Sequence, residues 1–152
     1  MRVFEAHKAA QLPLPFGRFR PAAETDLHTL THWAAAFFEE AGLRDPGDAA
    51  QEQISEGRLF AWEDEQPASM AAWVGRTGRA VRINFVFTPP DLRGRGYASA
   101  CVASLTLRLL DEGLASCCLC SDLANPTSNR IYQAIGYRPV CDAGEYCLEA
   151  GQ

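Results

Sequence analysis

The sequence predicts a mixed α/β domain with the element order β-α-α-β-β-β-α-β-α-β-β. Three observations support this class. The chain has 152 residues, a length that suits one hydrophobic core. Hydrophobic residues make up 47% of it and charged residues 22%, which is ordinary globular usage. Segments with helical spacing of apolar residues alternate with short runs rich in β-branched and aromatic residues. We expect a tail or linker at residues 1–15 and a single domain at residues 16–152.

The first elements are marked by prolines. Residues 1–15 show no clear periodicity and contain Pro13 and Pro15, which favours a tail or linker. Residues 16–20 are expected to form a short strand, which Pro21 stops.

Two helices are predicted next. Thr25 or Asp26 can cap the first helix, and Gly42 ends it. The second helix opens with Pro46 near its first position and reaches about residue 56.

The middle of the chain predicts three strands separated by polar turns. Their β-branched and aromatic content is typical of strands, and the third run also alternates. Pro89 and Pro90 stop the third strand. The predicted strands cover residues 59–62, 68–74 and 81–88, and the turns between them cover residues 63–67 and 76–79.

The second half predicts a strand between two helices and a closing hairpin. A long helix opens after residues 91–95, and a buried strand follows at residues 115–120. Asn125 can cap the last helix, which ends at Gly136. The segment 81–120 should form a right-handed parallel crossover. Residues 137–141 and 145–148 are expected to pair as a hairpin around residues 142–144.

The charge is unevenly distributed. The net charge of −5 argues against general nucleic-acid binding. Residues 24–65 contain eleven acids and two arginines and carry −9, while the remainder carries +4. This stretch is either a solvated acidic face or a surface that attracts a cationic substrate. The sequence has no apolar run of about 20 residues and no signal peptide at its start, so we expect a cytoplasmic protein without membrane contact.

Cysteine and histidine residues do not form a metal-binding pattern. The cysteines lie in apolar runs, where a free thiol behaves as a small hydrophobe, and we expect neither disulfides nor a metal. His28 and His32 have Thr29 where a zinc-protease motif needs glutamate, so they are interpreted as a surface pair. The cysteines are Cys101, Cys117, Cys118, Cys120, Cys141 and Cys147.

The loop at residues 93–99 is the strongest candidate for a ligand site. Its glycines allow the backbone to approach a ligand closely, and the first N–H groups of the following helix lack intrahelical partners. Together with the helix dipole, these groups suit a phosphate or pyrophosphate. The alternative is an ordinary strand-to-helix turn that uses glycine for its geometry. The loop lacks the Gly-Lys-Ser/Thr of a P-loop, and the acidic residue of a dinucleotide-binding motif is also missing.

Two motifs then resemble those of the GCN5-related N-acetyltransferase (GNAT) family. Residues 86–98 resemble its coenzyme A signature, Arg/Gln-x-x-Gly-x-Gly/Ala, with Arg93, Gly96 and Ala98 in the fixed positions. Residues 125–137 resemble the family's Asn-x-x-Ala/Ser-x-x-Leu/Ile-Tyr-x-x-x-Gly-Phe/Tyr. The sequence of residues 81–140 is most similar to the C-terminal domains of tandem acetyltransferases. The resemblance implies the GNAT fold, with a mixed central sheet splayed between the family's fourth and fifth strands.

The resemblance also assigns roles to individual residues. It implies acetyl-CoA as acyl donor, a primary amine as acceptor, and direct attack in a ternary complex without a metal. Tyr132 falls where the family places the general acid that protonates the departing thiolate. The backbone of the fourth family strand would pair with the pantetheine arm, the loop amides would bind the pyrophosphate, and two asparagines would contact the coenzyme. These cofactor-binding residues are Val86, Phe87, Thr88, Arg93, Gly94, Arg95, Gly96, Tyr97, Ala98, Ser99, Asn125 and Asn129.

The usual general base is missing from this pattern. The two positions where family members carry a catalytic glutamate hold Arg82 and Cys120, and Asp122, Glu39 and Glu40 are weak substitutes. Three interpretations therefore stay open: an active enzyme on a small or peptidic amine, a non-catalytic acyl-CoA sensor, and a structural half of a longer enzyme. A homodimer or a tethered second GNAT domain is the assembly that the resemblance suggests.

Overall fold

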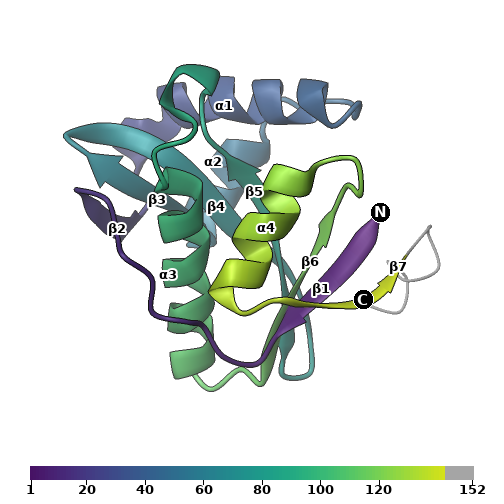
Figure 1. Cartoon of the computed structure of the whole chain (residues 1–152). Coiled ribbons are helices and arrows are strands. Elements are labelled where there is room, and N and C mark those ends of the chain that lie inside the picture. The colour runs from purple at the N-terminus through teal and green to yellow at the C-terminus, as the bar shows by residue number, and fades with distance from the viewer. Residues whose placement is uncertain (143–152) are drawn as a thin grey trace. The chain divides into compact units, whose positions relative to one another are not determined.

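The structure is a computed structural model that describes residues 1–142, in which four α-helices accompany seven strands (Figure 1). The α-helices are α1 (Leu27–Glu40), α2 (Ala49–Ser55), α3 (Tyr97–Asp111) and α4 (Pro126–Ile135). Short 3-10 turns, η1 (Glu24–Asp26) and η2 (Pro90–Leu92), precede α1 and α3. The strands are β1 (Arg2–Ala6), β2 (Arg18–Pro21), β3 (Leu59–Asp64), β4 (Gln66–Thr77), β5 (Ala80–Phe87), β6 (Ser116–Ser121) and β7 (Arg138–Asp142).

The strands form one sheet in the order β2-β3-β4-β5-β6-β1-β7, which confirms the mixed α/β class. The pairs β2–β3, β3–β4, β1–β6 and β1–β7 are antiparallel. The pair β5–β6 is parallel, as the crossover prediction requires, and its ladder covers only residues 80–82 of β5. Beyond residue 82, β5 is therefore not held to β6 by ladder pairs, as expected where the family sheet splays.

The described chain divides into two compact units. Unit 1 contains Met1–Pro13, Trp73–Asn84 and the chain from Val102 onward, and unit 2 contains Leu14–Ala72 and Phe85–Cys101. Strands β4 and β5 and helix α3 each contribute residues to both units. The residues that resemble the GNAT coenzyme A signature lie in unit 2, and those of the second motif lie in unit 1.

Aromatic residues form the core of unit 2 beneath helix α1. The α1 side chains Phe37 and Phe38 pack on Phe85 of β5, with ring centroids 5.2 and 5.5 Å apart. Trp33, one turn earlier, packs on Phe87 at 6.1 Å. The helical spacing of these apolar residues thus fixes α1 on the strand that leads into the Gly-rich loop.

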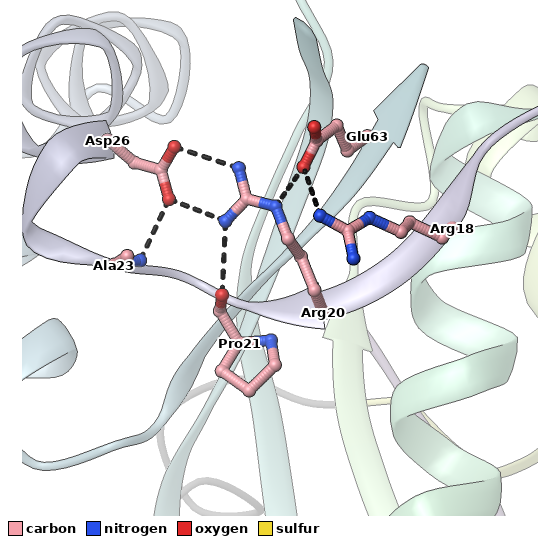
Figure 2. A network of polar contacts seen from close by, with 6 residues as sticks. All are labelled: Arg18, Arg20, Pro21, Ala23, Asp26 and Glu63. Carbon is pink, nitrogen blue, oxygen red and sulfur yellow. Dashed lines mark hydrogen bonds and ion pairs between the residues drawn. The ribbon is translucent and has the colours of Figure 1, made fainter. Parts of the chain in front are cut away.

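An ion network fixes the start of α1 (Figure 2). The Arg20 guanidinium donates to both carboxylate oxygens of buried Asp26, at 2.7 and 2.9 Å, and also pairs with Glu63. Asp26 additionally accepts the Ala23 N–H at 2.8 Å. The hydrogen bond from Arg20 lowers the pKa of Asp26. Asp26 stands at the N-cap position of α1 as predicted, but its carboxylate holds β2 and the residue preceding η1 instead of capping α1.

The structure corrects the secondary structure predicted for the N-terminal segment. Residues 2–6 form β1, not a tail or linker, and this strand lies between β6 and β7. Its alternation buries Phe4 and Ala6, while Val3 and Glu5 on the other face are half-buried. Both hydrogen-bonding partners of β1 come from the far end of the chain, so local sequence gives no sign of the pairing.

The start of the second helix also differs from the sequence prediction. Helix α2 begins at Ala49 instead of near Pro46, because the Asp45 carboxylate accepts the Gly47 N–H at 2.8 Å and forms a turn there. The second strand of the predicted C-terminal hairpin, residues 145–148, lies outside the described residues. Within the described part of the chain, no helix is long and apolar enough to cross a membrane.

Candidate functional site

The Gly-rich loop of unit 2 has a backbone that only glycine adopts readily. Gly94 and Gly96 have φ values of +80° and +85°, in the left-handed region. A Cβ added to Gly94 would meet no atom within 4 Å. Glycine is therefore needed at Gly94 for conformation, and the space above it is open to a ligand. Gly94, Arg95 and Gly96 are exposed.

The N–H groups of this loop form a continuous unpaired row. Ala100 is the first residue of the segment whose N–H has a backbone acceptor, the carbonyl of Gly96 at 3.0 Å. Within the described chain, the N–H groups from residue 94 to residue 99 have no hydrogen-bond acceptor. Helix α3 continues for 15 residues, so its dipole adds positive potential at this end. A row of donors with that potential is suited to a pyrophosphate.

The side chain of Arg93 is occupied by protein groups. Its Nε donates to the Thr88 carbonyl at 2.7 Å, and its terminal nitrogen lies 2.9 and 3.1 Å from the two carboxylate oxygens of Glu40. The guanidinium also lies over the Phe87 ring, 5.5 Å from its centroid. Arg93 therefore ties the end of β5 and the end of α1 to the loop, and coenzyme contact through its guanidinium stays a prediction.

The side chain of Tyr97 is also held by the protein. Its hydroxyl donates to Asp64 Oδ2 at 2.7 Å, and the ring is buried. The hydrogen bond to Asp64 is the main cause that raises the pKa of Tyr97, while nearby Arg95 lowers it. Because the phenol faces Asp64, the backbone N–H is the group that Tyr97 can offer to a phosphate.

Strand β5 enters the loop through a strained and tightly held end. Phe85 has a φ of +56°, a conformation that is rare for bulky residues and is concentrated at functional sites. Buried Ser69 donates to the Phe87 carbonyl at 3.2 Å, and its hydroxyl lies 2.9 Å from the Thr88 hydroxyl. Val86 is half-buried. Of the three predicted pantetheine-pairing residues, Phe87 and Thr88 thus have carbonyls that already accept one side-chain hydrogen bond each.

The asparagines of the second motif begin helix α4 in unit 1. Asn125 Oδ1 accepts the Ser128 N–H at 3.1 Å, which confirms Asn125 as the cap with Pro126 in the first position. Asn129 Nδ2 donates to the Asp122 carbonyl at 3.4 Å. Its Oδ1 is buried and has no partner among the described residues. A buried acceptor without a donor is compatible with the predicted contact between Asn129 and a ligand.

Tyr132 is buried in an aromatic cluster of unit 1. Its ring centroid lies 6.3 Å from that of Phe4 on β1 and 6.2 Å from that of Tyr137. Burial raises the pKa of Tyr132 to about 12, so the phenol keeps its proton at neutral pH. A general acid must hold its proton before it donates it, but a pKa this far above neutral makes the phenol a weak acid. Phe4 was not among the predicted site residues, because the strand that carries it was not predicted.

The candidate bases are poorly suited to that role. Arg82 and Cys120, at the usual base positions, are half-buried on β5 and β6. The Asp122 carboxylate accepts the Ala124 N–H at 2.9 Å, and Glu40 is paired with Arg93. Glu39, at the end of α1, is exposed. Of these carboxylates, two are already engaged by the protein.

The acidic segment 24–65 is partly neutralised within the fold. Five of its acids contact arginine or tyrosine side chains, while others remain exposed and available to a cation. The engaged acids are Asp26, Glu40, Glu56, Glu63 and Asp64. Exposed acids include Glu24, Glu39, Asp48, Glu52 and Glu65.

The fold has known counterparts in solved structures. A GNAT-family protein from Novosphingobium aromaticivorans matches with 24% identity and a TM-score of 0.67, over 91% of this chain and 59% of that one. A GNAT-family acetyltransferase from Colwellia psychrerythraea matches with 15% identity and a TM-score of 0.75, over 91% and 52%. The present chain thus spans less than two thirds of either protein.

A third match carries information on a ligand. It is a predicted acetyltransferase from Clostridium acetobutylicum whose structure contains acetyl-CoA, with 16% identity, a TM-score of 0.60, and coverage of 85% of this chain and 96% of that one. No curated protein matches the sequence. The family model for FR47-like proteins matches residues 61–146, more than half of the chain. The chain therefore belongs to the FR47-like proteins, and its fold is that of the GNAT-family structures that it matches.

Proposed function

We propose that this protein transfers an acetyl group from acetyl-CoA to a primary amine by direct attack in a ternary complex. The observation that carries the proposal is the row of unpaired N–H groups at residues 94–99, on a backbone that needs glycine at two positions. These donors suit the pyrophosphate of coenzyme A, and the open space above Gly94 permits close approach. A cytoplasmic location belongs to the same proposal.

Different groups of the protein would bind the coenzyme and transfer the proton. The backbone of residues 86–88 would orient the pantetheine arm, and the amides of residues 94–99 would bind the pyrophosphate. Acetyl-CoA supplies the activated acyl group. The amine nitrogen forms the new bond to the acyl carbon as the C–S bond breaks, and Tyr132 would give its proton to the departing sulfur. The attacking nitrogen would release one proton to water, and water would return a proton to the Tyr132 phenolate.

The acceptor is proposed to be a cationic small molecule or peptide that loses a proton before attack. Exposed acids such as Glu24, Glu39 and Glu52 favour attraction of a positive charge. Asp48 and Glu52 also line one hollow of about 240 Å³ together with Gln51 and Ser55.

A second candidate function is a non-catalytic acyl-CoA sensor. It is favoured by Arg82 and Cys120 at the usual base positions, and by the engagement of Asp122 and Glu40 with protein groups. A sensor would keep the donor site and would not need a base.

Two measurements separate these candidates. Calorimetric titration with acetyl-CoA should give binding in either case, and the absence of binding would rule out both. Incubation with acetyl-CoA and a panel of amines, followed by chromatography of released coenzyme A and mass measurement of the acceptor, should give an acetylated product for the enzyme. Binding without product on any amine would favour the sensor. Chromatography is needed because the protein's own cysteines would react with thiol reagents.

A further inference from the structure

A short segment of unit 2, residues 14–17, lies against the Gly-rich loop; we call it the strap. The position that a Cβ would occupy on Gly96 is 4.0 Å from Pro15 Cδ. This is a van der Waals contact distance. The strap therefore borders the row of N–H groups to which the proposed function assigns the pyrophosphate.

The strap is held in place on strand β3. Buried Trp62 donates from Nε1 to the Phe16 carbonyl at 3.1 Å. Gly17 has a φ of +126° and leaves no room for a Cβ, because the Glu63 carbonyl and the Trp62 indole lie against it. The ring of Pro15 fixes another backbone angle. The backbone of the strap is thus tightly packed where it meets β3.

The strap exposes its apolar side chains although its backbone is fixed. Phe16 is 89% exposed and Leu14 is 56% exposed, on either side of Pro15. A single exposed apolar residue needs no explanation. Here two exposed apolar side chains flank Pro15, the residue that borders the loop, on a backbone that is fixed.

We propose that Leu14 and Phe16 bind the adenine ring of coenzyme A, with Phe16 stacking on the base. This inference rests on the proposed function, because it needs the pyrophosphate on the Gly-rich loop. In coenzyme A the adenosine is bonded directly to the pyrophosphate, so the base must lie close to the loop. Aromatic side chains stack on nucleobases without regard to base identity, and the stacking contributes substantially to affinity.

The test compares coenzyme A with 4′-phosphopantetheine, which lacks the adenosine and keeps only one phosphate for the loop to bind. Phe16→Ala should weaken coenzyme A binding about tenfold, within the range measured for base stacking. It should change phosphopantetheine binding less than twofold. Phe16→Trp should keep the affinity for coenzyme A. Leu43→Ala is the matched control, because Leu43 is 60% exposed in the same unit and lies outside the strap.

Each outcome decides the inference. An unchanged coenzyme A affinity in Phe16→Ala would overturn it. An equal loss for both ligands would also overturn it, because Phe16 would then support the loop instead of the base. A change of oligomeric state in light scattering, with unchanged coenzyme A affinity, would assign Phe16 to a protein contact. If the unmodified protein binds no coenzyme A, the proposed function itself fails, which Phe16→Ala alone could not show.

Discussion

The Gly-rich loop of unit 2 and the start of helix α4 in unit 1 both match family motifs, but they use their residues in opposite ways. In the loop, the side chains of Arg93 and Tyr97 are engaged by Glu40 and Asp64, while the backbone donors have no partners. At α4, the group without a partner among the described residues belongs to a side chain, the buried Oδ1 of Asn129, while Asn125 caps the helix.

Because of this difference, the two sites need different kinds of substitution to test them. A site built from backbone N–H groups survives removal of its side chains, so only a change of backbone conformation tests it directly. A site built from side chains is tested by truncation.

The largest effect is expected for Tyr132→Phe in unit 1. Loss of a general acid should lower kcat about 100-fold or more and leave coenzyme affinity nearly unchanged. Since burial raises the pKa of Tyr132 to about 12, its ionisation should not reduce turnover up to about pH 10. Steady-state kinetics at several pH values, with an amine that the protein acetylates, measures kcat and its dependence on acetyl-CoA concentration.

Tyr137→Phe is the matched control. The Tyr137 hydroxyl lies 2.8 Å from buried Thr106 Oγ1, so its loss should cost about 1 kcal/mol of unfolding free energy without a comparable loss of kcat. If Tyr132→Phe turned over normally, the general-acid role would be wrong.

Gly96→Val tests the backbone site directly. A β-branched residue at a φ of +85° is strained by about 1–3 kcal/mol, so the loop should shift and coenzyme affinity should fall about 10- to 100-fold. Gly113→Val introduces similar strain at a φ of +104° after helix α3, and it should reduce stability but not coenzyme affinity. Equal affinity losses in both variants, measured by calorimetry, would contradict a backbone site in the loop.

Asn125→Ala distinguishes a helix cap from a coenzyme contact. Loss of the hydrogen bond to the Ser128 N–H should lower the unfolding free energy by about 1 kcal/mol. Denaturant titration measures this change, and Asn125→Ser should restore most of the stability because serine also caps helices. A marked loss of coenzyme affinity in Asn125→Ala would show that the side chain has a second role.

The smallest effect is expected for Glu40→Gln. The side chains of Arg93 and Glu40 are 46% and 52% exposed, so their ion pair contributes about 0–1 kcal/mol. Coenzyme affinity should fall by no more than about fivefold, and less at high salt. Glu39→Gln removes the same charge from the neighbouring exposed residue and should have less effect. Equal effects of the two variants would indicate general electrostatics instead of loop positioning.

Three features could be predicted from the sequence alone: the mixed α/β class, the parallel strand–helix–strand unit, and the Asn125 cap. These features depend on local signals: helical spacing, alternation along residues 80–87, and Gly or Pro at element ends. The two motifs also predicted the GNAT family, and the family model for FR47-like proteins covers both of them.

Contacts between residues far apart in the sequence could be seen only in the tertiary structure. Strand β1 pairs with β6 and β7, more than 100 residues away, and brings Phe4 against Tyr132. Glu40 reaches Arg93 and Asp64 reaches Tyr97 in the same way. Such partners leave no periodic trace in the chain, because a pairing across the sheet or between loops is set by packing and not by local spacing. The sequence therefore located the loop, and the structure showed that its backbone N–H groups are unpaired while the side chains of Arg93 and Tyr97 are engaged by the protein.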